Sequence, residues 1–205
     1  MILRYKISHI LSHLSITFIP RACLGKLTKG QNMIQNISHT ARKSSVREDE
    51  NMIRVCFVCH GNICRSTMAQ FVFQDMINQA NLTNKFHIDS AATSREEIGN
   101  PPHHGTVNKL REVGIPILPH RAVQMTKQDY KKYDYLIGMD EWNIRNMMRI
   151  VGKDPEKKIH MLLDFTQSPR AIADPWYTGN FDVTYDDVKE GCEAFLQYLK
   201  KEHHI

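Results

Sequence analysis

A cysteine, an arginine and a serine lie close together in the segment C-H-G-N-I-C-R-S, which runs from Cys59 to Ser66. A Cys-x5-Arg spacing is weak evidence by itself. Here, however, it lies between a run that predicts a strand and a pattern that predicts a helix. A loop between a strand and a helix points backbone N–H groups inward, and the helix N-terminus adds about half a positive charge. Such a loop can hold a tetrahedral oxyanion such as phosphate.

The residues of this segment suit distinct tasks in phosphate chemistry. The N–H groups, the helix dipole and Arg65 favour the thiolate of Cys59, which is the form that attacks phosphorus. The planar fork of Arg65 can bind two phosphoryl oxygens, and the Ser66 hydroxyl can donate to the thiolate and help it leave. Gly61 and Asn62 tolerate the left-handed backbone angles that a tight loop needs. The alternative for Cys59, taken alone, is a buried structural thiol.

Cleavage of a phosphate ester also requires a proton for the leaving oxygen, and Asp174 is the candidate general acid. It lies in the sequence A-D-P-W-Y after a Ser-Pro turn, on a loop that we expect to be irregular. Trp176 and Tyr177 could form the wall of a pocket for a flat substrate ring. The simpler interpretation of Asp174, without this context, is an ordinary Asp-Pro turn.

The elements around these residues alternate between strands and helices. Runs of β-branched and aromatic residues predict strands at 53–58, 86–90, 133–139 and 158–163. Apolar spacing predicts helices at 66–80, over about ten residues ending near Gly114, at 141–151 and at 182–201. Ser66 could cap the first of these helices. The alternation indicates βαβ units and an α/β fold in which helices flank a parallel sheet.

The composition is that of an ordinary globular chain, with 205 residues of which 41% are hydrophobic and 24% charged. The net charge of +5 arises in residues 1–51, which hold eight Lys and Arg against three acids, whereas residues 52–205 hold 19 of each. A neutral body gives no electrostatic argument for nucleic-acid binding. No stretch reaches the roughly 18 uncharged apolar residues of a membrane-spanning helix. Five cysteines at low density favour a reducing compartment, here the cytoplasm, over a secreted disulfide scaffold.

We expect residues 1–51 to be an N-terminal extension, disordered or dispensable, and residues 52–205 to be the functional domain. The extension is basic, contains serine and has no acid before Glu48, as a targeting peptide would. Its apolar run is interrupted by His and Ser, which argues against a secretory signal. Met52 opens directly onto the first predicted strand, so an upstream start codon is the alternative that explains the extension most simply. A partner-binding tail is a third interpretation.

Residues 52–205 resemble the low-molecular-weight protein tyrosine phosphatases in motifs, order and spacing. The resemblance is carried by V-C-H-G-N-I-C-R-S, D-S-A-A-T-S, I-G-N-P-P, Y-L-I-G-M-D-E-W-N and D-P-W-Y. It implies a three-layer α/β fold with a four-stranded parallel sheet, helices on both faces, and the catalytic loop between the first strand and the first helix. It also implies that the chain hydrolyses protein phosphotyrosine, or another aryl phosphate, through a phosphocysteine intermediate.

The same resemblance implies a role for each residue of the site. Cys59 would be the nucleophile, Arg65 would clamp the phosphoryl group, and Asp174 would protonate the leaving group and then activate water. Substrate-binding roles fall to His60, Gly61, Asn62, Ile63, Cys64, Ser66 and Trp176. The loop would be supported by a hydrogen-bond network of Asn62, Ser66, Ser90 and His120. We expect no cofactor or metal, no nucleic-acid partner, no membrane insertion, and a monomer or weak dimer.

Several positions depart from the family pattern. Thr67 replaces a proline, and a first helical turn tolerates either residue. His60 replaces a leucine. Glu96 replaces an aromatic residue that flanks the substrate ring, which leaves Trp176 as the main aromatic wall. The sequence P-H-H at 102–104 replaces P-P-D; we expect solvated loop histidines there, with a metal site as the alternative.

Three other functions are available on the same fold. Thioredoxin-linked arsenate reductases use further cysteines downstream, but no cysteine lies between Cys64 and Cys192, and Cys192 falls in a helix whose pattern predicts core. Phosphoarginine phosphatases tend to carry threonine where Ile63 stands, so an apolar residue favours an aryl ester. A non-catalytic phosphopeptide-binding module would require loss of the nucleophile, the arginine or the acid, and all three are present.

We predict that a chain starting at Met52 folds and keeps full activity, because every motif residue lies downstream of it. The measurement compares the melting temperature, and kcat/KM for p-nitrophenyl phosphate, between the truncated and full-length chains. A large fall in either value on truncation would contradict the prediction and would show that residues 1–51 pack against the domain.

Overall fold

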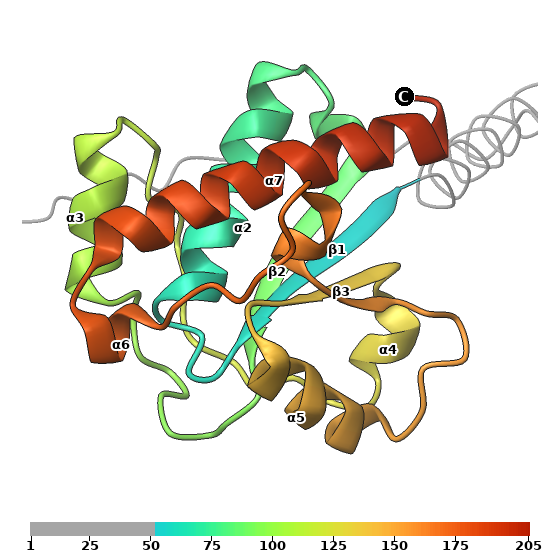
Figure 1. The fold of residues 1–205 in the computed structure, drawn as a ribbon, viewed down its shortest axis with the longest axis horizontal. Coiled ribbons are helices and arrows are strands. Elements are labelled where there is room, and N and C mark those ends of the chain that lie inside the picture. The colour runs from blue at the N-terminus through green and yellow to red at the C-terminus, as the bar shows by residue number, and fades with distance from the viewer. Residues whose placement is uncertain (1–51) are drawn as a thin grey trace, which may run out of the picture. The chain divides into compact units, whose positions relative to one another are not determined.

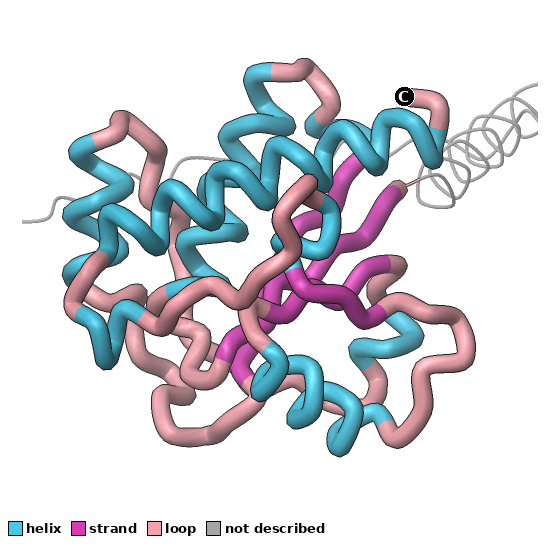
Figure 2. The backbone as a smooth tube through the Cα atoms, in the orientation of Figure 1, coloured by secondary structure: helices cyan, strands magenta, loops and turns pink. Residues whose placement is uncertain are grey.

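The computed structural model describes residues 52–205, and the predicted N-terminal extension, residues 1–51, lies outside the described residues. Strands and helices alternate along the described chain, as the sequence pattern predicts (Figure 1 and Figure 2). The elements are β1 (Ile53–Cys59), α2 (Arg65–Gln79), η1 (Thr83–Lys85), β2 (Phe86–Ala92), α3 (His104–Glu112), α4 (Asp129–Lys132), β3 (Tyr135–Gly138), α5 (Glu141–Val151), β4 (Ile159–Met161), η2 (Leu162–Phe165), α6 (Pro175–Thr178) and α7 (Phe181–His203).

The strands form one parallel sheet of order β2-β1-β3-β4. Helices α2, α3 and α7 lie on one side of the strands in Figure 1, and α4 and α5 lie on the other. The prediction of a three-layer α/β fold with four parallel strands is therefore confirmed. Among residues 52–205, no helix is long and apolar enough to span a membrane.

The strand β1 lies inside the sheet and determines where the predicted loop emerges. It pairs with β2 on one side, where Cys59 lies opposite Ala92, and with β3 on the other, where Val58 lies opposite Gly138. Strand order therefore reverses at β1, and α/β folds bind ligands at the carboxyl ends of the strands next to such a reversal. The loop 60–64 begins at this point.

Alternate residues of β1 serve two hydrophobic cores. Val55 and Phe57 belong to the larger core, to which α2 and α7 also contribute, whereas Cys56 and Val58 belong to a smaller core shared with α5. The side-chain period of two along a strand explains this alternation. Burial on both faces explains why the strand is apolar along nearly its whole length, as is usual in parallel sheets.

Some element bounds differ from the prediction. β2 is two residues longer, because Ala91 and Ala92 continue the pairing with β1. β3 begins only at Tyr135, because the chain just before it forms the short helix α4, which the sequence pattern did not indicate. β4 ends at Met161, and the last two residues of the predicted strand belong to η2.

The prediction that Ser66 caps the first helix is wrong. Helix α2 begins at Arg65 with Cys64 at its N-cap position, and no side chain caps it. Ser66 is inside the helix and fully buried. Its hydroxyl contacts Cys59 Sγ and the Asn62 side chain, and does not cap the helix. Thr67 fits the first turn as expected, since its hydroxyl donates to the Cys64 carbonyl at 2.8 Å.

We predict that Gly191→Ala lowers the free energy of unfolding by about 1–3 kcal/mol, because α7 has no room for a methyl group at this position. A Cβ there would lie 2.6 Å from Leu162 Cγ and 3.2 Å from Leu163 Cδ2, and both leucines are fully buried. In an unobstructed helix the same substitution stabilises by about 1 kcal/mol, so the expected sign is opposite to the intrinsic preference.

Chemical denaturation measures the effect in wild type, Gly191→Ala and the control Lys189→Ala. Lys189 is an exposed residue of the same helix, so its substitution should change stability by less than about 0.5 kcal/mol. A Gly191→Ala protein as stable as wild type would contradict the close packing of α7 on η2.

Candidate active site

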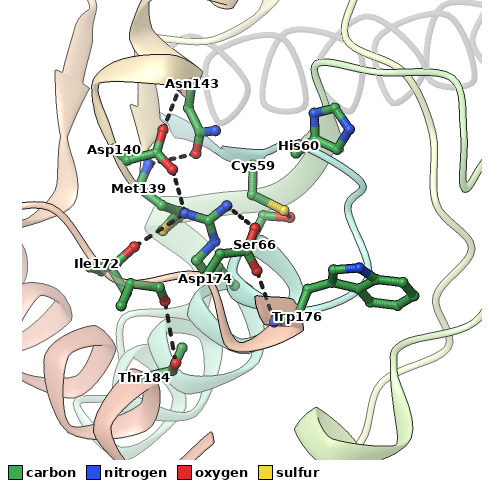
Figure 3. A network of polar contacts seen from close by, with 12 residues as sticks. Cys59, His60, Ser66, Met139, Asp140, Asn143, Ile172, Asp174, Trp176 and Thr184 are labelled. Atoms are coloured by element: carbon green, nitrogen blue, oxygen red, sulfur yellow. Dashed lines mark hydrogen bonds and ion pairs between the residues drawn. The ribbon is translucent and has the colours of Figure 1, made fainter. Parts of the chain in front are cut away.

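The loop 60–64 curls around the sulfur of Cys59 (Figure 3). The Asn62 N–H donates to Cys59 Sγ at 3.3 Å, and the Ser66 hydroxyl lies 3.1 Å from the same sulfur. Cys59 is only 3% exposed, and α2 begins directly after the loop. A backbone N–H, a hydroxyl and a helix N-terminus thus surround one sulfur, and all three favour negative charge there.

Asn62 shapes the loop from its centre. Its φ of 58° lies in the left-handed region, which asparagine tolerates better than most residues. Its side-chain amide donates to Ser66 Oγ at 2.9 Å and to Ser90 Oγ at 2.8 Å, and its carbonyl accepts from His120 Nε2 at 3.0 Å. The structure therefore places Asn62, Ser66, Ser90 and His120 in one hydrogen-bonded network.

Gly61 does not have the backbone angle that the sequence analysis predicted for it. Its backbone angle is not in the left-handed region, so the expected role in a left-handed turn is wrong for this residue. A Cβ at Gly61 would lie 3.1 Å from Glu97 Cγ, which is tighter than an ordinary contact. The Glu97 side chain therefore leaves little room for a methyl group at Gly61.

Arg65 lies at the start of α2 with its guanidinium buried. Nη1 donates to Asp140 Oδ2 at 2.5 Å and to the Ile172 carbonyl at 3.1 Å, and Nη2 donates to Asp174 Oδ2 at 2.5 Å (Figure 3). Burial alone would lower the pKa of Arg65, but Cys59, Asp174 and Asp140 together hold it above its ordinary value. Nε is buried and has no hydrogen-bond partner among residues 52–205.

Asp174 has two structural contacts, one for each carboxylate oxygen. Oδ1 accepts from the Trp176 N–H at 3.1 Å, which makes Asp174 the N-cap of α6, and Oδ2 accepts from Arg65. The segment is therefore a capped helical turn, not the irregular loop predicted, because Pro175 fits the first helical position. The cap fixes the carboxylate while leaving it partly exposed.

A cavity of about 110 Å³ opens over Cys59, which is the volume of a few water molecules and suits a phosphoryl group. Asn62 and Ser66 lie behind the loop, fully buried, and Arg65 lines an adjoining cavity. Cys59 and Asp174 both line this cavity. The contact that joins the loop to the acid is made by Arg65, which is 109 residues from Asp174 in sequence. The predicted site residues that line this cavity are Cys59, His60, Gly61, Ile63, Cys64, Asp174 and Trp176.

Two departures from the family pattern contact each other at the mouth of this cavity. His60 Nε2 lies 2.9 Å from Glu96 Oε2, and both side chains are exposed. An exposed pair of this kind adds little stability. Its consequence is local: a polar bridge stands where the family pattern has a leucine and an aromatic residue. The aromatic wall of the cavity consists of Trp176 and Tyr177.

The prediction of solvated loop histidines is right about the exposure of His104, although this residue begins α3, and wrong for His103. His103 Nδ1 accepts from the Gly105 N–H at 3.1 Å and caps α3, while its ring stacks on Phe181 with centroids 5.2 Å apart. Burial, followed by repulsion from His104, lowers the pKa of His103. Residues 52–205 contain no group of three or more side chains able to hold a metal ion.

The other thiols near the site lie in surroundings that keep them neutral. Burial, and then the nearby Cys59, raises the pKa of the Cys64 thiol to about 12. Burial also raises the pKa of Cys192, whose Sγ contacts the Ala69 carbonyl inside the larger core. The described cysteines are all free thiols. No cysteine lies between Cys64 and Cys192, so a relay of electrons from Cys59 through that part of the chain is not possible.

Asp140 and Gln70 support the site and are absent from the sequence prediction, as is Glu97, which lines the cavity over Cys59. Asp140 binds Arg65 and also accepts from the Asn143 N–H at 2.7 Å, which caps α5. Its position between a predicted strand and a predicted helix, inside the motif Y-L-I-G-M-D-E-W-N, was a usable signal. Gln70 Oε1 accepts from the Ser90 hydroxyl at 2.6 Å and extends the network behind the loop, and nothing in the sequence indicates this.

Comparison with known proteins identifies relatives for most of the chain. The family model for low molecular weight phosphotyrosine protein phosphatase matches residues 54–205. The low molecular weight protein-tyrosine-phosphatase YfkJ of Bacillus subtilis (strain 168) is 40% identical over 156 residues, covering 75% of this chain and 100% of YfkJ. The low molecular weight phosphotyrosine protein phosphatase of Homo sapiens is 38% identical over 148 residues, covering 70% and 93%. The crystal structure of YfkJ matches with a TM-score of 0.72 and 42% identity, covering 74% of this chain and 96% of that one.

We predict that His120 makes the domain less stable as the pH falls from about 7 to about 5. Burial lowers the pKa of His120, and the neutral ring donates its Nε2–H to the Asn62 carbonyl. An unfolded histidine takes up a proton near pH ~6.5. The stability that the neutral ring contributes is therefore present above that pH and is lost as the pH falls through the lower folded value.

The test measures the melting temperature of wild type and His120→Gln across this pH range, together with the titration of the His120 ring by NMR. Glutamine keeps a donor but does not titrate, so its melting temperature should fall less with pH. A ring that titrates at or above pH ~6.5, or an equal fall in both proteins, would contradict the prediction.

Proposed function

We propose that Cys59, Arg65 and Asp174 perform the reaction of this chain. The chain belongs to the low molecular weight phosphotyrosine protein phosphatase family and is a cysteine-dependent protein-tyrosine phosphatase. One observation carries the proposal: Arg65, which follows the loop around Cys59, donates a hydrogen bond to Asp174, a residue 109 positions later in the chain. This contact supports a shared site, because it joins the cation at the end of the loop to the acid that lines the cavity over Cys59. Those are the groups that a two-step phosphoryl transfer requires.

In the first step, the Cys59 thiolate attacks the phosphorus of phosphotyrosine. The S–P bond forms as the P–O bond to the tyrosine oxygen breaks, which yields phosphocysteine and the tyrosine side chain. The Asn62 N–H and the Ser66 hydroxyl, at 3.3 and 3.1 Å from the sulfur, stabilise the thiolate before it attacks. The same two groups stabilise it again when it leaves in the second step.

Arg65 binds the phosphoryl group through the N–H that has no partner among the described residues. A buried, unpaired N–H costs free energy, and a phosphoryl oxygen in the cavity would satisfy Arg65 Nε. The interaction strengthens as charge spreads over the equatorial oxygens in the transition state. Asp140 and the Ile172 carbonyl hold the opposite side of the guanidinium in place.

Asp174 acts first as a general acid and then as a general base. Its proton passes to the tyrosine oxygen as the P–O bond breaks. Its carboxylate then takes a proton from the water that attacks phosphocysteine, which releases inorganic phosphate and restores the thiolate. The α6 cap supports this role, because it fixes the carboxyl group at the cavity beside Trp176.

The lining of the cavity favours an aryl phosphate. Ile63, Trp176 and Tyr177 give it apolar surface that suits a tyrosine ring better than a phosphoarginine. Arsenate reduction through a cysteine relay has no support, since Cys192 is buried in the core. A purely binding role has no support either, because the thiol, the arginine and the acid are all present beside the cavity.

The reaction proposed here uses side chains of this chain and water. We infer that it takes place in a reducing compartment such as the cytoplasm, because a catalytic thiolate is easily oxidised and the described cysteines are free thiols. The partner is a protein that carries phosphotyrosine. That the active form is a monomer or a weak dimer stays a prediction.

We predict that Asp174→Asn slows the hydrolysis of phosphotyrosine and phenyl phosphate by roughly 10²–10⁴-fold and slows that of p-nitrophenyl phosphate far less. Asparagine keeps an oxygen that can cap α6, but it has no proton to give to the leaving group. p-Nitrophenolate is a good leaving group and departs without protonation, so its ester depends little on the acid.

The measurement is kcat for these substrates in wild type, Asp174→Asn and Cys59→Ser. The Cys59→Ser control should lose all turnover and still bind inorganic phosphate, because the loop N–H groups and Arg65 remain. An equal loss for both kinds of substrate would exclude Asp174 as the acid. Turnover by Cys59→Ser would exclude Cys59 as the nucleophile.

A further inference from the structure

A second cavity, of about 500 Å³, adjoins the cavity over Cys59. The two cavities share three lining residues: His60, Asp174 and Tyr177. The proposed reaction takes place in the first cavity and assigns no ligand to the second. Because the second lies directly beside the reacting groups, it is within reach of the substrate residues that flank the phosphotyrosine.

Helix α5 forms one wall of the second cavity, through Trp142, Asn143 and Asn146. In Figure 3, Asn143 and Trp176 lie on opposite sides of Cys59, so the two cavities extend from the loop in different directions. An extended peptide advances about 3.3–3.6 Å per residue. A substrate whose phosphotyrosine ring packs along Trp176 can therefore place a neighbouring side chain against α5.

Two aromatic side chains of the second cavity are exposed to solvent. Trp142 is 61% exposed and Tyr177 is 84% exposed. Exposed aromatic rings of this size are typical of binding sites, where they supply contact area. The Arg145 guanidinium lies 4.0 Å from the centre of the Trp142 ring, and α5 is tied to the active site because Asp140 both caps the helix and binds Arg65. Trp142 thus stands on a fixed element.

The charged groups that line the second cavity already have partners. Arg65 pairs with Asp140 and Asp174, and His60 pairs with Glu96. A charged substrate side chain would lose water here without finding an unpaired opposite charge among the described residues that line the cavity. An apolar side chain would instead gain contact area on the two exposed rings. The walls therefore favour an uncharged aromatic or large aliphatic group.

We propose that this cavity is a second substrate subsite, which takes a large apolar or aromatic side chain next to the phosphotyrosine. The inference rests on the proposed function, which places the phosphotyrosine over Cys59. Trp142 is then a specificity-determining residue, since it contacts the flanking substrate side chain and none of the reacting atoms. The subsite selects phosphotyrosine proteins by the sequence around the modified residue.

The test uses the full chain and phosphotyrosine peptides that differ only in the residues on either side of the phosphotyrosine, which are glycine, phenylalanine or glutamate. In wild type we expect kcat/KM to be about tenfold higher for the phenylalanine peptide than for the glycine peptide, mainly through KM, with no gain for glutamate. Trp142→Ala should abolish most of this ratio, and Trp142→Phe should keep most of it. The control Val183→Ala, which removes an exposed apolar side chain outside both cavities, should keep the wild-type ratio.

A ratio between two peptides is insensitive to a general loss of activity, and Trp142→Phe, which keeps an aromatic ring, separates the loss of the ring from damage to α5. A wild type without preference for phenylalanine, or a Trp142→Ala ratio equal to that of wild type, would overturn the subsite. A wild type that hydrolyses no aryl phosphate would overturn the proposed function itself. If Trp142→Ala leaves the ratio unchanged but dissociates a dimer in sedimentation, the surface serves a second copy of the chain and the subsite is wrong.

Discussion

The buried guanidinium of Arg65 joins the loop after β1 to two segments that lie much later in the chain. It donates to Asp140 at the start of α5, to the Ile172 carbonyl, and to Asp174 at the start of α6. A buried cation needs partners to replace the water it has lost, and removal of one partner leaves charge uncompensated. The same contacts that satisfy Arg65 therefore fix the acid and the helix α5 relative to the thiol.

The parallel sheet makes these contacts attainable, because its strands end at one edge. Cys59 is the last residue of β1, and Asp140 follows the end of the neighbouring strand β3. The loop between β1 and α2 is so short that Asn62 adopts a left-handed backbone angle. Its hydrogen bonds to Ser66 and Ser90 offset the cost of that conformation, which explains why a buried polar network lies behind an otherwise apolar strand.

The loop and the rim of the cavity differ in how they are built. The loop is held by backbone groups and buried side chains, so its shape depends little on what lies at the surface. The rim consists of exposed side chains, among them the His60–Glu96 pair and the rings of Trp176 and Tyr177. A polar pair at this place leaves ring recognition to those two aromatics. Discrimination among substrates then depends on the rim and on the proposed subsite along α5.

Local patterns in the sequence predict the order of strands and helices and the strand-loop-helix unit around Cys59 and Arg65, because these depend on residues close together in the chain. Asp174 is also recognisable as an acid before a proline. Its contact with Arg65, and the part played by Asp140, are decided only by the tertiary structure. So is the pairing of His60 with Glu96. These partners are between 36 and 109 residues apart, and they meet only because the sheet brings the ends of its strands, and the segments that follow them, to one edge.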